Sequence, residues 1–428
     1  MRIAMLTSNY KPFVGGVPIS VERLAEGLRR QGHTVFVFAP ECGDCVDDIW
    51  TYRFQTVRPL QSGGFHFRQL LDQTVYRIFP TLGVELIHVH DPFLVGHMAL
   101  RLGRKYHIPV IFTHHTRYEQ YLHYVGVYAA AEARARAGHP VTAGLLREVR
   151  ERWLPERVAA FENRCSAVIA PSESMRQELL RLGVVRPVQA IPTGLPESAF
   201  AWDAAESVRL RWQLAGDRPY LLCTVSRLGR EKNLETLLRC MVLLKEQIGA
   251  VFRLAVLGEG PQRAALETLR DCLGLREEVT FCGAAENSSI ASYHRASDVF
   301  VFTSRTETQG IVLLEAMAAG CPVVALRTPG PQDVIRDGLN GFLTCEADFA
   351  PRIAELLRSA SLRKSLSSGA LYTARCFTAD EIARRAEAFY CEVCAGWYSP
   401  ARRALLAGGA SYADSARGRG PLDSRWGQ

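Results

Sequence analysis

One stretch of the chain, LLCTVSRLGREKNLETLLRCM at residues 221–241, shows how the sequence is built. Residues 221–226 form an apolar run of the kind that becomes a strand buried on both faces of a sheet. After the turn at 227–233, Leu234, Leu237, Leu238 and Met241 recur at the 3.6-residue spacing of a helix with one buried face. The stretch therefore predicts a strand, a turn and a helix, the repeating unit of a parallel α/β sheet.

Similar units fill most of the chain. The sequence predicts strands at 3–7, 34–38, 86–89, 110–113, 167–170, 221–226, 253–257, 279–282, 299–303 and 322–325. A cluster of turn residues, Ile191-Pro192-Thr193-Gly194-Leu195-Pro196, separates two series of these units. We therefore predict an α/β fold of two Rossmann-like, doubly wound domains, residues 1–190 and 191–376.

The end of the chain has two different patterns. Residues 377–400 have an amphipathic helical pattern, and we expect them to pack back on the first domain. Residues 405–428 are rich in Gly, Ala, Ser and Arg, a composition typical of a flexible tail.

Composition and charge exclude several classes of protein. The chain has 428 residues, of which 48% are hydrophobic, enough for large cores. The formal net charge is +7, but no dense stripe of Lys and Arg is interleaved with aromatic residues, so nucleic acid is not an expected partner. No apolar run reaches the roughly 18 residues of a membrane span, and the N-terminus has no signal-peptide pattern. We therefore expect a cytoplasmic protein.

The chain has 12 cysteines, including two pairs with the spacing of half a zinc site, Cys42/Cys45 and Cys391/Cys394. These pairs could form one metal site if the two ends of the chain meet. In a long chain without a secretory signal, ordinary reduced thiols are the favoured interpretation.

The pair Gly15-Gly16 lies between the first predicted strand and a helix that begins near Ile19. Glycines in such a turn let backbone N–H groups approach an anion, and the helix N-terminus adds partial positive charge. Any tight turn could use the same pair. The Gly-x-Gly-x-x-Gly fingerprint and the Gly-Lys-Ser/Thr of a P-loop are both absent, which argues against a Rossmann dehydrogenase and a P-loop kinase.

Arg227 and Lys232 lie in the turn after the strand at 221–226. A guanidinium and an ammonium at this place can neutralise a diphosphate without a metal ion. A solvated basic turn is the structural alternative. No Asp-x-Asp occurs in the chain, so we expect neither a metal-bridged donor site nor a metal cofactor.

Glu307 and Glu315 are separated by seven residues, one in the loop after the strand at 299–303 and one on the following helix. Both can face the carboxyl ends of the strands, where open α/β sheets bind ligands. Glu315 also interrupts a helix that is otherwise apolar from 311 to 319, where an unpaired carboxylate would be costly. Two carboxylates here can accept hydrogen bonds from the vicinal hydroxyls of a sugar and a ribose.

Four elements together resemble, in order and spacing, the retaining nucleotide-sugar glycosyltransferases of family four, which have the GT-B fold. They are Gly15-Gly16, Arg227 with Glu231-Lys232-Asn233, Gly258-Glu259-Gly260-Pro261, and the Glu-x7-Glu element from Glu307 to Glu315. The resemblance covers residues 1–398 and implies two domains facing across a cleft, the first on the acceptor side and the second holding the donor.

By this resemblance Arg227 and Lys232 bind the donor diphosphate, Glu307 the transferred sugar and Glu315 the ribose, while Gly16 approaches the distal phosphate. The implied donor-binding set is Gly15, Gly16, Arg227, Lys232, Glu307, Gly310 and Glu315. The family also has a His-Thr element beside the anomeric carbon, which His115 matches, so the implied catalytic residues are His115, Arg227, Lys232 and Glu307. For His114 we expect only hydrogen bonding beneath the loop.

Residues 113–124 and Glu307-Thr308-Gln309-Gly310 resemble the subgroup that glucosylates diacylglycerol at the membrane surface. Most of the wider family has Phe where Gln309 stands, and Gln120 replaces the usual Asp of a Tyr-Glu-Asp-Tyr pattern. The acceptor and membrane residues expected from this pattern are Arg117, Tyr118, Tyr121 and Tyr124.

The segment 118–164 mixes aromatic, leucine and arginine side chains without a predicted strand. Such a segment can lie in a membrane interface, with Arg on lipid phosphates. A packed helical hairpin with a solvated charged face explains it equally well. The first alternative adds peripheral attachment to the inner face of the cell membrane.

The sequence thus predicts a retaining glycosyltransferase that moves a hexose, glucose from UDP-glucose, to a lipid hydroxyl such as that of diacylglycerol or a glycolipid. Three alternatives stay open: the same fold acting on a soluble or polysaccharide acceptor, a nucleotide-sugar epimerase, which the Glu307–Glu315 element disfavours, and a nucleotide-sugar-binding protein without catalysis.

Overall fold

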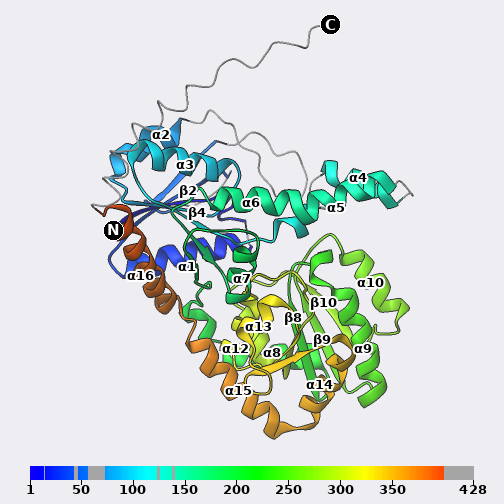
Figure 1. Ribbon diagram of the computed structural model, residues 1–428. Coiled ribbons are helices and arrows are strands. Elements are labelled where there is room, and N and C mark those ends of the chain that lie inside the picture. Colours follow the sequence, from blue (N-terminus) through cyan, green and yellow to red (C-terminus); the bar gives the residue numbers. More distant parts are fainter. Residues whose placement is uncertain (14, 43–46, 56–72, 123–125, 137–139, 400–428) are drawn as a thin grey trace.

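Two parallel sheets, each covered by helices on both faces, organise the chain (Figure 1). The computed structural model describes residues 1–428 except 14, 43–46, 56–72, 123–125, 137–139 and 400–428. The two-domain α/β fold predicted from the sequence is confirmed, and the predicted tail at 405–428 lies outside the described residues.

The first sheet has the strand order β3-β2-β1-β4-β5-β6-β7 within the described residues. Its strands are β1 (Arg2–Leu6), β2 (Thr34–Pro40), β3 (Thr51–Phe54), β4 (Leu86–Val89), β5 (Val110–Thr113), β6 (Ala167–Ala170) and β7 (Val188–Ala190). The central strand β1 pairs in parallel with both neighbours, placing Ile3 beside Val35 and Leu86. Order reverses between β1 and β4, the position at which doubly wound sheets bind ligands.

The second sheet has the order β10-β9-β8-β11-β12-β13. Its strands are β8 (Tyr220–Val225), β9 (Phe252–Leu257), β10 (Val279–Gly283), β11 (Val299–Phe302), β12 (Val323–Leu326) and β13 (Gly341–Thr344). The stretch 221–241 becomes β8, a short 3-10 turn and helix α9, as its pattern predicts.

The helices lie between the strands in the chain. Those of the first domain are α1 (Gly16–Arg30), α2 (Thr74–Ile78), α3 (Leu94–Tyr106), α4 (Gly126–Arg136), α5 (Pro140–Glu148), the π-helical turn η4 (Val149–Trp153), α6 (Leu154–Glu162) and α7 (Glu173–Arg181). Those that follow are α8 (Ala204–Ala215), α9 (Leu234–Ile248), α10 (Arg263–Cys272), α11 (Ile290–Ala296), α12 (Ile311–Ala318), α13 (Pro329–Val334), α14 (Glu346–Arg358), α15 (Ala360–Arg375) and α16 (Ala379–Trp397). Short 3-10 turns are η1 (Phe79–Leu82), η2 (Tyr118–Gln120), η5 (Glu197–Phe200) and η6 (Arg230–Lys232).

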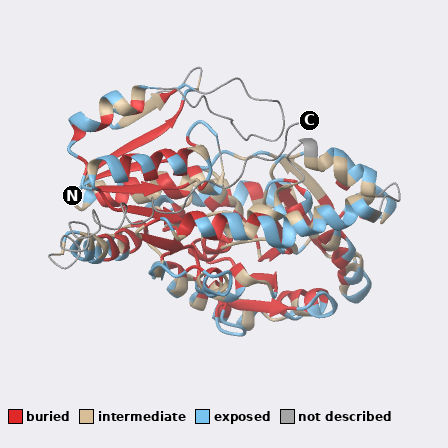
Figure 2. Ribbon diagram, turned by 45° about the horizontal axis from the view of Figure 1, so that its top comes forward, coloured by how far each residue is buried: buried red, intermediate tan, exposed pale blue. Residues whose placement is uncertain are grey.

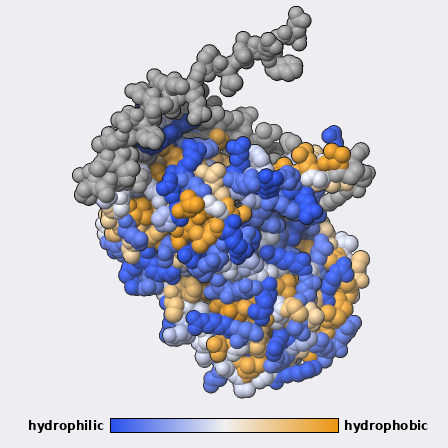
Figure 3. Space-filling view, in the orientation of Figure 1, coloured by the Kyte–Doolittle hydropathy of each residue, from blue (hydrophilic) through white to orange (hydrophobic). Residues whose placement is uncertain are grey.

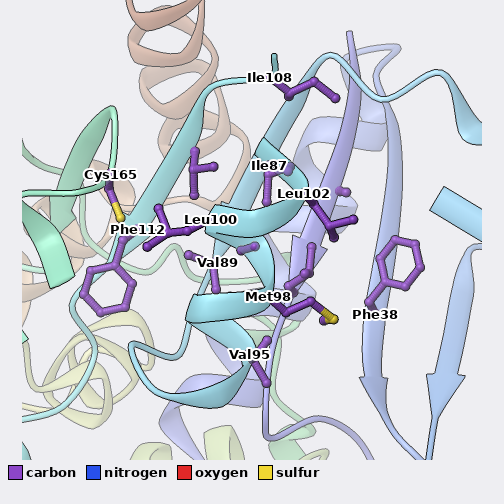
Figure 4. Close-up of a cluster of buried hydrophobic side chains, with 14 of the residues drawn as sticks. Phe38, Ile87, Val89, Val95, Met98, Leu100, Leu102, Ile108, Phe112 and Cys165 are labelled. Carbon is purple, nitrogen blue, oxygen red and sulfur yellow. The ribbon is translucent and has the colours of Figure 1, made fainter. Parts of the chain in front are cut away.

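Burial follows the sheets, whose strands are buried while the outer helix faces are exposed (Figure 2). In the first domain Val95, Met98 and Leu102 of α3 pack on Phe38 and Ile87 of the sheet (Figure 4). Burial of such side chains contributes roughly 1.5–3 kcal/mol each before the cost of ordering them. The rigid sheets therefore fix where each strand ends, and so where the loops of the site begin.

Helix α16 leaves the second domain and packs on α1 of the first (Figure 1). A Cβ on Gly27 of α1 would lie 2.8 Å from the Cβ of Ala383, so the glycine permits this close approach of the two helices. Beside it, Leu195 N–H donates to the Phe377 carbonyl and Ala379 N–H to the Leu195 carbonyl, each at 2.7 Å. The two segments that join the domains thus run together at one place, which we call the crossing (residues 191–196 and 377–379).

Candidate active site

The loops that follow β5, β8 and β11 meet where the carboxyl ends of the two sheets face each other. Thr308 Oγ1, in the loop after β11, donates to the His115 carbonyl after β5 at 2.9 Å. This contact joins residues 193 positions apart in sequence. The structure therefore brings the predicted donor and acceptor loops into direct contact.

Lys232 and Glu307 form the charged centre of the site. Lys232 Nζ donates to Glu307 Oε1 at 2.5 Å, and Ser304 Oγ donates to the same oxygen at 3.2 Å. Burial opposes the charge of Lys232, but attraction to Glu307 outweighs it and raises the pKa of the lysine. Lys232 is therefore a permanent cation at neutral pH, the form needed to stabilise a phosphate.

The turn that carries Lys232 is held by the end of β11. Thr303 Oγ1 donates to the Lys232 and Asn233 carbonyls at 3.3 and 3.1 Å, and Asn233 Nδ2 donates to the Thr303 carbonyl at 3.2 Å. Asn233 has φ 56°, a left-handed conformation that Asn tolerates. The end of one strand thus sets the direction of the lysine that follows another.

Arg227 is exposed at the mouth of the same turn. The Gly258–Gly260 loop lies directly behind it, where a Cβ on Gly258 would lie 1.9 Å from the Ser226 carbonyl oxygen. Ser226 Oγ is buried without a hydrogen-bond partner among the described residues. An unsatisfied buried hydroxyl beside an exposed guanidinium indicates a position for a polar ligand.

Gly15 and Gly16 form the start of α1, with Gly15 extended as the N-cap. No side chain caps this end and its first turn holds no acidic residue, so its N–H groups stay available for an anion. A Cβ on Gly16 would meet nothing within 4 Å, so there is open space above the helix start. Gly310, the other predicted donor-binding glycine, has φ 82° and begins α12.

Glu315, the single charged residue in the apolar pattern of α12, has an ion-pair partner. Arg23 of α1 donates from Nη2 to Glu315 Oε1 at 2.8 Å and from Nη1 to the Gly194 carbonyl at 3.3 Å. The cost of a carboxylate on the apolar helix α12 is thus offset by a cation from the other domain. One carboxylate oxygen of Glu315 is bonded to Arg23 before any ligand binds.

His88 and His90, at the end of β4, were not predicted from the sequence. His90 Nδ1 shares a hydrogen bond with His115 Nε2 at 2.8 Å, and His88 bonds to Thr113 Oγ1 at 2.6 Å and to the Tyr390 hydroxyl at 2.7 Å. Burial, with His115 as a nearby charge, lowers the pKa of His88 to about 3, and burial with His114 lowers that of His115 to about 3. These rings are neutral at physiological pH. The signal in the sequence was His88-Val89-His90-Asp91 at the end of a strand.

His114 points to the other side of the loop, where its Nδ1 bonds to the fully buried Glu162 at 2.7 Å. This is the hydrogen-bonding role beneath the loop that the sequence favoured. A cavity of about 490 Å³ opens beside it, with apolar walls from α6 and α7 and charged groups at its rim. Its lining includes Arg117, Tyr118, Gln120, Leu154, Val158 and Met175.

The predicted acceptor tyrosines Tyr118 and Tyr121 lie in different parts of the site. Tyr118 lies on the first domain, with its ring 5.2 Å from that of Phe93 and 5.9 Å from that of His114. Burial raises the pKa of Tyr121, and the charges of Lys232 and Glu307 also act on it. Tyr121 thus lies against the charged centre, while Tyr124 falls outside the described residues.

Helices α4 and α5 form a hairpin that projects from the first domain (Figure 1). Val141 and Leu145 of α5 are 85% and 65% exposed, and Trp153 follows at 51%. Apolar surface gathers on this hairpin at the right of the view in Figure 3. Arg147 of α5 pairs with Glu151, and Arg152 of the following turn η4 pairs with Glu156, in each case four residues further on.

The cysteine pairs do not form a site within the described residues. Cys391 and Cys394 are free thiols on α16, as expected. Cys42 is disulfide-bonded, so the expectation of a reduced thiol is wrong for this residue, and Cys45 lies outside the described part. No three His, Cys, Asp or Glu side chains in the described ranges are grouped so as to hold a metal ion. Nor does any described helix combine the length and apolar character required to cross a bilayer.

Two protein families match the chain, one on each domain. The family described as Glycosyltransferase Family 4 matches residues 14–198, and that described as Glycosyl transferases group 1 matches residues 209–371. These ranges include Gly15-Gly16 and His115 in the first case, and Lys232, Glu307 and Glu315 in the second.

Similar proteins cover nearly the whole chain. Alpha-monoglucosyldiacylglycerol synthase of Streptococcus pneumoniae is 29% identical over 91% of this chain and 85% of its own length. The enzyme of the same name from Acholeplasma laidlawii is 24% identical over 92% and 97%.

Among solved structures, sucrose-phosphate synthase of Thermosynechococcus elongatus has a TM-score of 0.71 at 23% identity, covering 92% of this chain and 99% of its own. HepE of Anabaena, solved with UDP, has a TM-score of 0.69 at 19% identity, covering 92% and 100%. Their likeness shows the GT-B fold. Together with the two family matches, it establishes that the chain belongs to the family-four glycosyltransferases of GT-B fold and is a hexosyltransferase.

Proposed function

We propose that this glycosyltransferase moves glucose from UDP-glucose to a lipid hydroxyl, such as that of diacylglycerol or a glycolipid, with retention at the anomeric carbon. The observation that carries the proposal is the position of the Lys232–Glu307 pair: Thr308, the residue after Glu307, donates to the His115 carbonyl, and the charges of the pair act on Tyr121. It brings a cation, the carboxylate that would bind the sugar, and the loop of His115 close together.

Lys232, Arg227 and the start of α1 would hold the donor diphosphate. When the bond between the anomeric carbon and the phosphate oxygen breaks, negative charge develops on the leaving group, and fixed cations and N–H groups stabilise it without solvent reorganisation. Glu307 would accept hydrogen bonds from sugar hydroxyls, and Glu315 from the ribose. This cationic arrangement supplies the charge stabilisation that a metal ion provides elsewhere, so we expect catalysis without a metal cofactor.

The neutral His115 fits a place beside the reacting carbon. An imidazolium there would repel the positive charge that develops on the sugar ring as the leaving group departs. Burial, which lowers the pKa of His115 to about 3, keeps the ring uncharged. The family resemblance favours attack of the acceptor hydroxyl from the face that the leaving group vacates.

Two observations support a lipid acceptor. The relatives in Streptococcus pneumoniae and Acholeplasma laidlawii are named as enzymes that form a glucosyl diacylglycerol. The side chains of Val141, Leu145 and Trp153 are apolar and exposed, and the segment that follows α5 lines the cavity at Arg117 and Tyr118 through Arg150, Glu151 and Leu154. Such a hairpin can insert into the headgroup layer and bring the acceptor loop to the membrane surface.

The experiment incubates the purified protein with labelled UDP-, GDP- and ADP-sugars and with vesicles of phosphatidylglycerol and diacylglycerol. We expect chloroform-soluble label from UDP-glucose. Lys232→Ala should lower this rate by about 100-fold or more. The matched control is Lys245→Ala, which removes another lysine–glutamate pair of the second domain, Lys245–Glu278 at 2.9 Å, and should leave the rate unchanged.

Other outcomes separate the alternatives. A labelled water-soluble product would favour a soluble or polysaccharide acceptor. UDP-glucose binding without hydrolysis or transfer would indicate a binding protein. Wild-type turnover in Lys232→Ala would contradict the assignment of the donor site.

A further inference from the structure

We propose that Gln309 is a positioning residue that fixes the Glu307 loop to the crossing between the two domains. The inference rests on the proposed role of Glu307 in holding the transferred sugar. In the sequence, Gln309 only distinguishes a subgroup, because most of the wider family has Phe at this position. In the structure, its contacts hold the loop in place.

Both polar atoms of the Gln309 side-chain amide bond to the crossing. Thr193 N–H donates to Gln309 Oε1 at 2.6 Å, and Gln309 Nε2 donates to the Thr193 carbonyl at 3.0 Å. Gln309 is 4% exposed and Thr193 7%. Two reciprocal bonds in a buried place define both the distance and the orientation of the loop, as a pair of bonds does between two strands.

The neighbouring side chains of the loop reach different parts of the site. Glu307 contacts Lys232 of its own domain, and Thr308 donates to the His115 carbonyl of the other domain. Three consecutive residues therefore connect the donor cation, the acceptor loop and the crossing. A shift of Gln309 by even one ångström would move Glu307 relative to both Lys232 and His115.

The surroundings leave the loop little freedom to compensate. A Cβ on Gly330 would lie 2.9 Å from the Cβ and the carbonyl oxygen of Glu307, so α13 packs directly on the loop backbone. On the other side, Thr193 Oγ1 donates to Ser20 Oγ of α1 at 2.9 Å. The crossing is thus tied to the helix whose first turn would face the phosphate. A buried Phe at position 309 could fill space but could form neither amide bond.

The first test replaces Gln309 with Met, which has a similar shape but neither amide group. We expect kcat for sugar transfer to fall at least tenfold while the Kd for UDP, which carries no sugar, stays within twofold. Exchange of backbone amide hydrogens should accelerate in the peptides that cover 188–196 and 303–310, because Thr193 N–H loses its acceptor.

The matched control is Asn340→Leu. Asn340 is another buried amide of the second domain, which donates to the Val334 carbonyl and to Thr373 Oγ1 and accepts from Arg336 N–H. It should lower the melting temperature about as much as Gln309→Met, without changing kcat or the exchange at the crossing.

Gln309→Glu supplies a second readout. Its carboxyl can still accept from Thr193 N–H, but in the ionised form it faces the Thr193 carbonyl with no proton to donate. Burial raises the pKa of such a carboxyl, so acid should restore a neutral donor. The kcat of this variant relative to wild type should rise as the pH falls from 8 to 6. A side chain that only fills space would show no such pH profile.

Three results would overturn the proposal: a kcat of Gln309→Met within twofold of wild type, an equal loss of UDP affinity, or unchanged exchange at 188–196. If the wild-type protein transfers no sugar, the proposed function fails first. The exchange measurement would then decide alone. Faster amide exchange in Gln309→Met would support the role of the two Gln309–Thr193 bonds, and unchanged exchange would refute it.

Discussion

The charge of a single side chain in this site depends on its burial, as His88 shows. The ring is fully buried between Tyr390 and Thr113, so its pKa falls from 6.5 to about 3. The unfolded chain therefore takes up this proton first when the pH falls. The stabilising contribution is complete above pH 6.5 and is lost progressively as the pH falls from 6.5 towards 3.

This linkage predicts the behaviour of His88→Gln, which keeps a donor and an acceptor but does not titrate. Between pH 7.5 and 5.0 the free energy of unfolding of the variant should fall by about 2 kcal/mol less than that of wild type, measured by urea denaturation. His107→Asn, an exposed histidine at φ 55°, is the control and should follow wild type. Parallel pH profiles of His88→Gln and wild type would show that His88 takes up its proton at the same pH in the folded and unfolded states, which would contradict the lowered pKa.

Motif spacing decided which residues the sequence could identify. Glu307 and Glu315 were found because two carboxylates around an apolar helix are unusual in themselves. His88 and His90 were not found because a histidine in an apolar strand is as common in a core as in a site. The partner of Glu315 could not be found at all, since Arg23 lies 292 residues away in sequence and only folding brings the two together.

At the level of elements, the strands with continuous apolar runs were predicted within one or two residues, and three others were missed. The missed strands are β3 (TYRF), β7 (VQA) and β13, which begins with Gly341. All three lie at the edge of a sheet. β3 and β7 are short and partly solvated, so their sequences need not carry the apolar run that marks a central strand. β13 is buried, but it has only four residues and begins with a glycine, so its sequence also lacks a clear strand pattern.

The hairpin of α4 and α5 carries the next prediction. Val141→Ser with Leu145→Ser should reduce co-sedimentation with phosphatidylglycerol vesicles at least tenfold, because two exposed apolar side chains no longer enter the interface. The fold should be unaffected, since both side chains are already in water. Higher salt should weaken the binding of the wild-type protein to these anionic vesicles, because salt screens the attraction between charges.

The chain offers a matched control on α8, where Val208 and Trp212 are 71% and 78% exposed with the same spacing of four residues. Serine at both positions should leave vesicle binding unchanged. Equal losses in the two double variants would mean that binding depends on general surface apolarity, and no loss in either would remove the hairpin from the membrane proposal.

For the whole molecule, the sequence predicted two domains but not the contacts that hold them together. Asp333 of α13 accepts from Ser174 N–H at 3.0 Å, placing a negative charge at the start of α7 in the other domain. Arg23 reaches from α1 to both Glu315 and the crossing. Each contact joins a side chain of one domain to a group that its own local sequence leaves unsatisfied, so local patterns could not reveal it.

Arg23→Met tests how far these contacts determine the closed arrangement. Removing the guanidinium leaves a half-buried carboxylate on α12 without its partner, a loss of about 1–3 kcal/mol at the domain interface. We expect a larger radius of gyration in X-ray scattering and a separation of thermal unfolding into two transitions. Arg30→Met on the same helix removes the exposed pair with Asp380, which does not join the two sheets, and should change neither measurement. If Arg23→Met keeps the wild-type radius of gyration and unfolds in one step, the interface does not depend on Arg23. The Gln309–Thr193 bonds and the Asp333–Ser174 contact would then suffice to hold the two domains together.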